Sequence, residues 1–252
     1  MLKRTFIHLP GIGLKTESHF WRQGISTWED FLAVGTLSGL NPLRLNLLKQ
    51  LVQESLDHLE VARYFACRLP GPEQWRLFRQ FRSRAAYLDI ETHGAAWPAL
   101  QVTVVGLFDG WRMRQFVHGY NLEEFPQALE DLDLLVTFNG TQFDLPVLKA
   151  YFPGLRLPPI HLDLRFILAR LGFRGGLKKI EPRFGIRRPP EVAGMNGYDA
   201  VLLWERHLRG DLTALDLLLE YNREDVANLE VLMERAVNLC LGNALGENPQ
   251  NI

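Results

Sequence analysis

The sequence has few cysteines and contains no long apolar run. Two cysteines, Cys67 and Cys240, occur in 252 residues, and no C-x-x-C pair is present. This excludes a disulfide framework and indicates a reducing compartment, in which we expect both thiols to be buried. No apolar stretch approaches the ~20 residues of a membrane span, and the N-terminus lacks the apolar core of a signal peptide. We therefore expect a cytoplasmic protein that makes no membrane contact.

The chain also has almost no net charge. Its 28 basic and 29 acidic residues, with 47% hydrophobic residues, are typical of a folded globular protein and exclude a disordered or collagen-like chain. The charge is uneven, because residues 1–84 hold 12 basic and 7 acidic residues, whereas residues 85–252 hold 16 and 22. A basic head on an acidic body fits a nucleic-acid-handling protein with a metal site, but on this evidence alone we favour uneven surface charge.

Turn residues and periodicity divide the chain into four predicted segments: a helical head at 1–70, a linker helix at 71–84, an α/β domain at 85–240 and a C-terminal tail at 241–252. In the third segment the strand patterns come first, and Asp109-Gly110 marks a hairpin. Helix patterns follow at about 164–172, 176–184, 197–209 and 212–240. This order predicts a mixed sheet covered by helices.

Two carboxylates stand on one predicted strand. In Leu88-Asp89-Ile90-Glu91-Thr92, Asp89 and Glu91 project from the same face, while Leu88 and Ile90 face the core. Two carboxylates on one face repel each other unless a cation lies between them, and Mg²⁺ prefers such oxygen ligands. The alternative is a solvent-facing side of the strand. A turn expected directly after Glu91 places both acids at the strand's carboxyl end, where sites in open sheets gather.

Two further motifs carry acids. Asp144 follows a second buried strand in FNGTQFDLP, near the start of a helix, where an acid also favours the helix N-terminus electrostatically. Tyr221 and Asp225 are four residues apart and share one face of a long helix. Each motif is common alone, but the ordered set D-x-E, N-G-x-x-F-D and Y-x-x-x-D is far more specific.

This ordered set resembles the DEDD (DnaQ-like) 3′–5′ exonuclease superfamily. Tyr221 resembles its DEDDy branch, because the histidine branch would need His where this chain has Glu220. The motifs YLDIET, VTFNGTQFDLPVL, GGLKKIEPRFGI and YNREDVANL are similar to the bacterial YprB-type family over about residues 85–235. The resemblance implies an α/β, ribonuclease-H-like mixed five-stranded sheet flanked by helices, with a small helical N-terminal appendage. In the head, LPGIG resembles the turn of helix-hairpin-helix modules, although a helix-packing appendage explains it equally well.

The resemblance also implies a two-ion centre. Two Mg²⁺ or Mn²⁺ ions would be held by four carboxylates, and Tyr221 would orient the attacking water. The chemistry supports this, since two ions ~3.5–4 Å apart generate the nucleophile and stabilise the leaving oxygen of a phosphodiester. Tyrosine, with a reference pKa of ~10, is a poor base near neutral pH and is better suited to holding the water. The predicted ligands are Asp89, which we expect to bridge the ions, Glu91, Asp144 and Asp225.

Four residues near these motifs are candidates for substrate binding. The resemblance places the turn with Thr92 and His93 near the 3′-terminal nucleotide, although His93 is equally well a surface turn residue. Asn139 either reaches the substrate or shapes its turn. Phe143 could stack on a base, but we favour packing in the core.

A basic stretch provides the fifth candidate, Lys178. Residues 165–188 hold eight basic residues against one acid, Glu181. The stretch either binds phosphates or forms a solvated helix face. For Asp163, just before it, we favour a structural role.

Together with the family resemblance, these residues lead us to expect a monomeric, divalent-metal-dependent 3′–5′ exonuclease that acts on single-stranded DNA or RNA ends. Two alternatives stay open: a structure-specific endonuclease on the same fold, and a catalytically silent module that binds nucleic acid without metal-dependent turnover. Transposase-like catalysis is disfavoured, because the Tyr-Asp helix and N-G-x-x-F-D fit the exonuclease pattern better.

Overall fold

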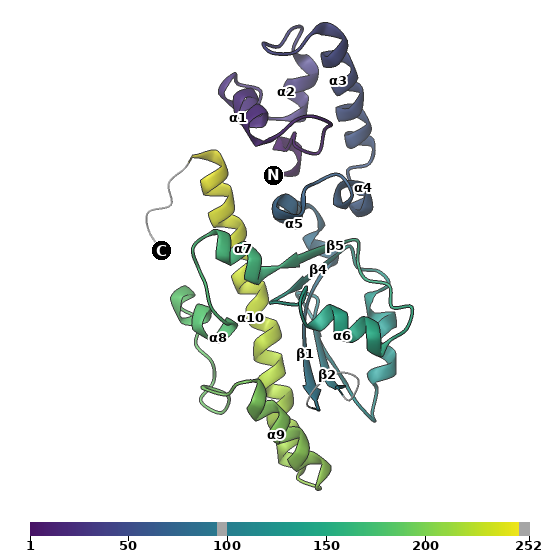
Figure 1. Cartoon of the computed structure of the whole chain (residues 1–252), viewed down its shortest axis with the longest axis vertical. Coiled ribbons are helices and arrows are strands. Elements are labelled where there is room, and N and C mark those ends of the chain that lie inside the picture. The colour runs from purple at the N-terminus through teal and green to yellow at the C-terminus, as the bar shows by residue number, and fades with distance from the viewer. Residues whose placement is uncertain (95–99, 247–252) are drawn as a thin grey trace. The chain divides into compact units, whose positions relative to one another are not determined.

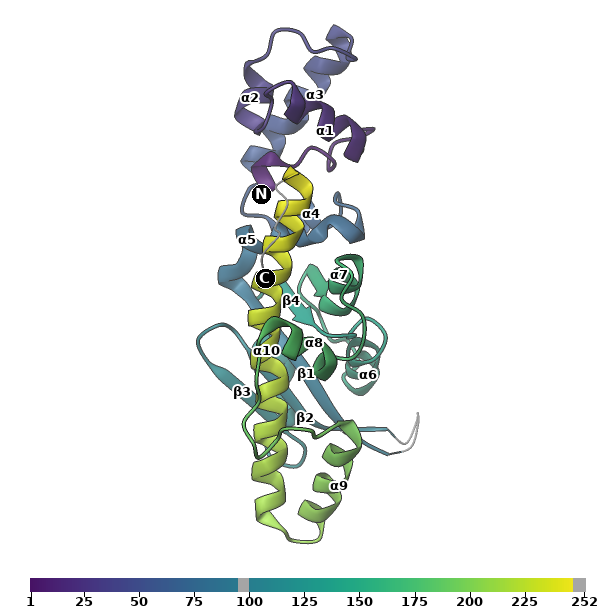
Figure 2. The same ribbon diagram turned by 90° about the vertical axis from the view of Figure 1, so that its left-hand side faces the viewer.

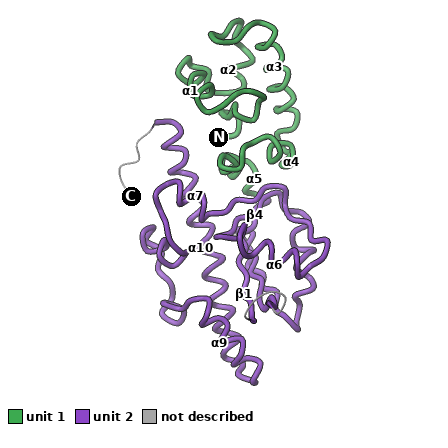
Figure 3. The backbone as a smooth tube through the Cα atoms, viewed as in Figure 1, with its two compact units in different colours: residues 1–83 green, residues 84–252 purple. Residues whose placement is uncertain are grey.

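A computed structural model describes residues 1–94 and 100–246 of the chain. The chain divides into two compact units, unit 1 at residues 1–83 and unit 2 at residues 84–252 (Figure 3). Among the described residues, none of the helices combines the length and the apolar character that a membrane span requires.

Unit 1 is helical, and its core is aromatic. The ring centroid of Phe6 lies 5.5 Å from that of Phe20 and 5.4 Å from that of Phe31. Thr27 caps α2 in a capping box with Asp30, as S/T-x-x-D/E spacing favours. The helices are α1 (Leu14–Arg22), α2 (Trp28–Ala33), α3 (Pro42–Asp57), α4 (Ala62–Ala66) and α5 (Phe78–Phe81), with 3₁₀ turns at Leu2–Arg4, Gly71–Leu77 and, across the boundary with unit 2, Arg82–Arg84.

The prediction of two buried thiols is wrong. Cys67, just after α4, is exposed, and Cys240 on the last helix is partly exposed. Cys67 is the residue that ends α4, and Cys240 lies in the last two turns of α10, where a small side chain need not face a core.

Unit 2 is built on the predicted mixed five-stranded sheet, which the structure confirms, in the order β3-β2-β1-β4-β5. The central strand β1 pairs antiparallel with β2 and parallel with β4, and β5 is parallel to β4. The carboxyl ends of the three parallel strands therefore lie at one edge. The strands are β1 (Ala85–His93), β2 (Gln101–Phe108), β3 (Met113–Val117), β4 (Leu134–Thr137) and β5 (Ile160–Asp163).

Helices cover both faces of this sheet (Figures 1 and 2). On one face, Leu88 and Ile90 of β1 pack with apolar residues of α6 and of a 3₁₀ helix at Leu122–Leu129. On the other face, Val104 of β2 packs against α9 and α10. The helices of unit 2 are α6 (Asp144–Tyr151), α7 (Leu164–Arg170), α8 (Leu177–Ile180), α9 (Gly197–Leu208) and α10 (Leu212–Leu245), with a 3₁₀ turn at Glu181–Phe184.

Several elements differ from their predicted extents. Helix α10 continues to Leu245, into the segment predicted as a C-terminal tail. Strand β1 continues through His93, two residues past Glu91, with an irregularity in its pairing with β2 between Glu91 and Thr92. The helix predicted at 176–184 is a single α turn, α8, followed by a 3₁₀ turn. Pro182 lacks an N–H and so cannot continue an α-helical hydrogen-bond ladder.

Candidate active site

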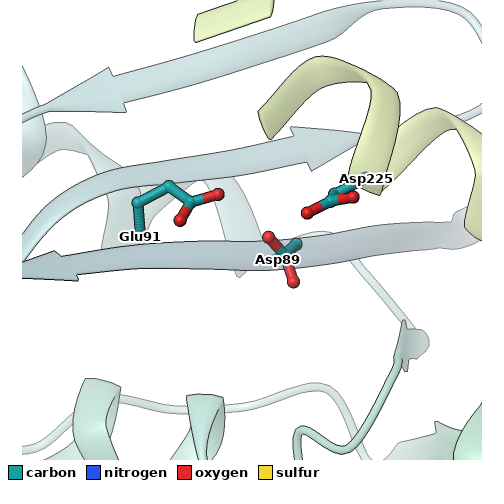
Figure 4. A group of neighbouring side chains, drawn as sticks. All are labelled: Asp89, Glu91 and Asp225. Carbon is teal, nitrogen blue, oxygen red and sulfur yellow. The ribbon is translucent and has the colours of Figure 1, made fainter. Parts of the chain in front are cut away.

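Three carboxylates meet where β1 and α10 face each other (Figure 4). Asp89 and Glu91 project from the same face of β1, and Asp225 approaches from α10. One ligand oxygen from each of these three residues lies within 4.8 Å of the others. We call Asp89, Glu91 and Asp225 the acidic triad. Strand alternation accounts for the first two, because Leu88 and Ile90 enter the core on the opposite face.

Asp144, the fourth predicted ligand, is not one of the three carboxylates within 4.8 Å of one another, but its charge contributes to the raised pKa of Asp89 and of Glu91. It begins α6 after the loop that follows β4, and its side chain is buried. The backbone N–H of Ile90, which separates the two acids of β1, hydrogen-bonds its carboxyl. Burial raises the pKa of Asp144 to about 7, and the charges of Asp163 and Asp225 add to the rise. A cation beside Asp144 would favour its charged form again.

The triad concentrates negative charge in a poorly solvated place. Burial raises the pKa of Asp89 and of Glu91 well above the ordinary values, and the charge of Asp225 raises both further. Glu91 Oε1 is buried and has no hydrogen-bond partner among the described residues. An unpartnered buried oxygen next to two other carboxylates matches the oxygen-rich donor set that Mg²⁺ and Mn²⁺ prefer. The residues therefore fit a divalent cation.

Tyr221 lies one helical turn before Asp225 and is buried, with 1% of its surface exposed. Lys178 Nζ, from α8, donates to the Tyr221 hydroxyl at 2.5 Å and to Asp225 Oδ2 at 2.9 Å. Burial raises the pKa of Tyr221, and the charge of Asp225 raises it further. The hydroxyl thus keeps its proton near neutral pH and is a hydrogen-bond donor.

Two residues of the basic stretch belong to the site and were not predicted: Arg188, which contacts Asp225, and Glu181, which contacts Arg188. Arg188 Nη2 donates to Asp225 Oδ1 and to Glu181 Oε1, the latter at 2.5 Å. Glu181 is the one acid among eight basic residues in 165–188. A single acid in a basic segment could have indicated this contact, because a buried acid needs a cationic partner.

Asn222 connects α10 to the sheet. Its Nδ2 lies 3.4 Å from the Asp89 carbonyl oxygen and 3.5 Å from Asp89 Oδ2, and its Oδ1 accepts from Gln115 Nε2 of β3 at 3.2 Å. This close approach depends on Gly106 of β2. A Cβ there would clash with Asn222 Oδ1 and would lie 2.7 Å from Val226 Cγ2.

Replacing Gly106 by alanine should therefore displace α10 from the sheet. Overpacking of a filled core destabilises by about 1–3 kcal/mol, and the shift would also separate Asp225 from Asp89. Urea unfolding of Gly106→Ala measures the loss. Gly197→Ala is the matched control, since a Cβ at Gly197 meets nothing within 4 Å. Equal stability of Gly106→Ala and the unaltered protein would contradict this packing argument.

Thr92 and His93 are not in a turn, as predicted, but in the extension of β1. Both are partly buried, and His93 Nε2 lies 3.7 Å from Glu205 Oε1 of α9. Because Gly94 is close, the turn was predicted directly after Glu91. Pairing with β2 instead continues the strand through His93.

The loop after β4 places two other candidates. Asn139 has a left-handed backbone (φ 69°), and its Oδ1 accepts from Arg165 Nη1 at 2.5 Å, so it does shape the turn. Phe143 is 40% exposed, and the preference for core packing is wrong. Leu145 and Leu148 of α6 fill the core beneath it instead.

Asp163, at the end of β5, organises this same loop. Its carboxylate accepts from the backbone N–H groups of Asn139 at 2.8 Å, Thr141 at 3.0 Å and Arg165 at 3.1 Å. The structural role favoured for Asp163 agrees with these contacts.

Comparisons with known proteins identify a matching family model and a similar solved structure. A family model described as the RNase_H superfamily matches residues 86–237. No match was found among curated proteins. The family B DNA polymerase from the hyperthermophilic archaeon Pyrobaculum calidifontis is similar in structure, with a TM-score of 0.49 and 20% sequence identity. That match covers 60% of this chain and 24% of the polymerase chain.

Proposed function

Because the chain belongs to the RNase_H superfamily, we propose that unit 2 is a divalent-metal-dependent nuclease, with the acidic triad and Asp144 as the ligands of two Mg²⁺ or Mn²⁺ ions. The observation that carries this proposal is the meeting of three carboxylates within 4.8 Å of one another, one of which, Glu91, has a buried oxygen without a hydrogen-bond partner among the described residues. Lys178 and Arg188 pair with Asp225, but Asp89 and Glu91 remain crowded beside it with raised pKa values. A cation bound there would compensate their charge and would suit phosphodiester hydrolysis.

Each residue has a role that follows from its contacts. Ions bound to these carboxylates supply a nucleophile near neutral pH and neutralise the leaving oxygen. Tyr221 donates its hydroxyl proton in a hydrogen bond to the attacking water, since its raised pKa prevents it from acting as the base. Lys178, whose side chain is 32% exposed, is positioned to contact a phosphate oxygen of the substrate.

The finer assignment is a monomeric 3′–5′ exonuclease of the YprB-type family that acts on single-stranded DNA or RNA. It is supported by the order of the three motifs and by Tyr221 where the DEDDy pattern has its tyrosine. Phe143, exposed and adjacent to Asp144, offers a ring on which a terminal base can stack. Thr92, His93 and Asn139 complete the proposed substrate contacts.

Degradation of 5′-labelled single-stranded DNA and RNA, compared with covalently closed circles of the same sequence, tests this assignment. We expect a metal-dependent ladder that shortens from the 3′ end, with the circles intact. Cutting of circles would identify an endonuclease instead. Binding of both strands without cleavage in Mg²⁺ or Mn²⁺ would identify a silent module.

Tyr221→Phe should lower kcat by about 10²-fold, because loss of the hydroxyl leaves the water misplaced. Mn²⁺ binding should be unchanged, since Tyr221 is not a proposed ligand and phenylalanine keeps the buried ring. Single-turnover kinetics and Mn²⁺ titration measure the two effects. Cleavage by Tyr221→Phe at the unaltered rate would show that the hydroxyl has no part in the reaction.

A further inference from the structure

We propose that Arg188 and Glu181 form a positioning pair that presents Asp225 to the ions through a single oxygen, Oδ2. The inference rests on the proposed metal centre and adds to it two residues that do not themselves bind an ion. We call Arg188 and Glu181 the buried pair.

The buried pair is rigidly connected. Arg188 donates from Nε to Glu181 Oε2 at 2.8 Å and from Nη2 to Glu181 Oε1 at 2.5 Å, a two-pronged geometry that fixes both side chains. The side chains of Arg188, Glu181 and Asp225 are 6%, 3% and 6% exposed. Arg188 Nη1 is buried without a hydrogen-bond partner among the described residues, so this guanidinium directs its hydrogen bonds to the two acids.

The pair is also tied to the helix that carries Asp225. Asn228 Nδ2 donates to Glu181 Oε1 at 3.0 Å, and Asn228 lies on α10 three residues after Asp225. Glu181 is therefore held from two sides, by Arg188 and by α10. A movement of the segment that carries Glu181 and Arg188 would break the contact of Glu181 with Asn228 and that of Arg188 with Asp225.

This arrangement distinguishes the two oxygens of Asp225. Oδ1 accepts from the buried Arg188, whereas Oδ2 accepts from Lys178, which is 32% exposed, so an ion at Oδ2 would take the place of the Lys178 ammonium. The terminal torsion of an aspartate is broad and roughly two-fold, so an unrestrained carboxylate would sample many orientations. Arg188 restricts this torsion and leaves Oδ2 for an ion, as an outer-shell partner of a ligand does.

Glu181 makes this restraint compatible with cation binding. A lone guanidinium next to Asp225 would repel divalent ions, but Glu181 compensates its charge at hydrogen-bond distance. The pair thus supplies geometry while adding no net charge. Both residues can therefore be replaced together by neutral residues without changing the net charge of the site.

The double variant Glu181→Gln with Arg188→Gln uses that property. It exchanges a neutral pair for a neutral pair, so a change in Mn²⁺ affinity reports the loss of positioning. We expect Mn²⁺ affinity, measured by calorimetry on the full chain without nucleic acid, to fall about 10- to 100-fold. At saturating Mn²⁺, kcat should fall while KM for an oligonucleotide stays within about twofold. Glu220→Gln with Arg223→Gln, an exposed pair on α10, is the matched control and should leave both unchanged.

Two further variants separate the outcomes. Arg188→Lys keeps the charge but loses the two-pronged donor, so its Mn²⁺ affinity should be lower than that of the unaltered protein. This comparison does not depend on whether the double variant folds. Unchanged Mn²⁺ affinity in a folded double variant, or in Arg188→Lys, would overturn the positioning role. If Asp89→Asn binds Mn²⁺ as well as the unaltered protein does, the metal centre itself is refuted, and the positioning role with it.

Discussion

Asp89→Asn should abolish cleavage, with kcat reduced by about 10³-fold or more, or roughly 4 kcal/mol of transition-state stabilisation. Asp89 belongs to the acidic triad, with Glu91 on its own strand and Asp225 on α10. The amide keeps the shape of the side chain but removes the charge that a divalent ion requires. The effect therefore reports chemistry and not packing.

The same substitution should leave the fold intact or stabilise it. Burial and the neighbouring carboxylates raise the pKa of Asp89, so the charged form is disfavoured in the folded chain. Thermal unfolding in chelator should give Asp89→Asn a midpoint equal to or above that of the unaltered protein. Asp131→Asn, at an exposed position, is the control and should cleave normally. Cleavage by Asp89→Asn at the unaltered rate would remove Asp89 from the mechanism.

Divalent ions should stabilise unit 2 strongly. At 100 times its dissociation constant, a bound ion adds about 2.7 kcal/mol, which for a unit of this size raises the midpoint of thermal unfolding by roughly 5–10 °C. The physical reason is the repulsion within the triad, which an ion replaces by attraction. Circular dichroism melts in chelator and in Mn²⁺ measure this gain, and Asp225→Asn should lose most of it.

The increase in the midpoint of thermal unfolding that the ion causes should depend on pH. Asp144 has a folded pKa of about 7, above its unfolded value of ~3.9, so the stability it contributes in chelator is lost as pH rises through about 7. Ion binding requires the deprotonated carboxylates. The Mn²⁺-induced shift should therefore be larger at pH 8 than at pH 5.5. Equal melting temperatures with Mn²⁺ and with chelator at pH 8 would contradict the metal centre.

The parts of the site that sequence analysis predicts depend on local periodicity. Alternation along a strand is enough to place Asp89 and Glu91 together and Leu88 in the core. Spacing of four residues is enough to place Tyr221 and Asp225 on one face of α10.

The features that the sequence analysis missed depend on contacts between distant segments. Arg188 and Asp225 are 37 residues apart, and nothing in local spacing selects Arg188 from eight basic residues. Phe143 was assigned to the core from its apolar character, but the direction of its side chain depends on how the loop before α6 is held by Asp163. The end of β1 depends on its partner strand β2 and not on its own residues.

Diffraction at the manganese absorption edge, from crystals of the full chain grown with Mn²⁺, tests the central claim most directly. We expect two anomalous peaks, bounded by the acidic triad and Asp144 and separated by about 3.5–4 Å, as in two-metal sites. No peak at these carboxylates, with the triad well ordered, would contradict the proposal that they form the metal centre of a nuclease.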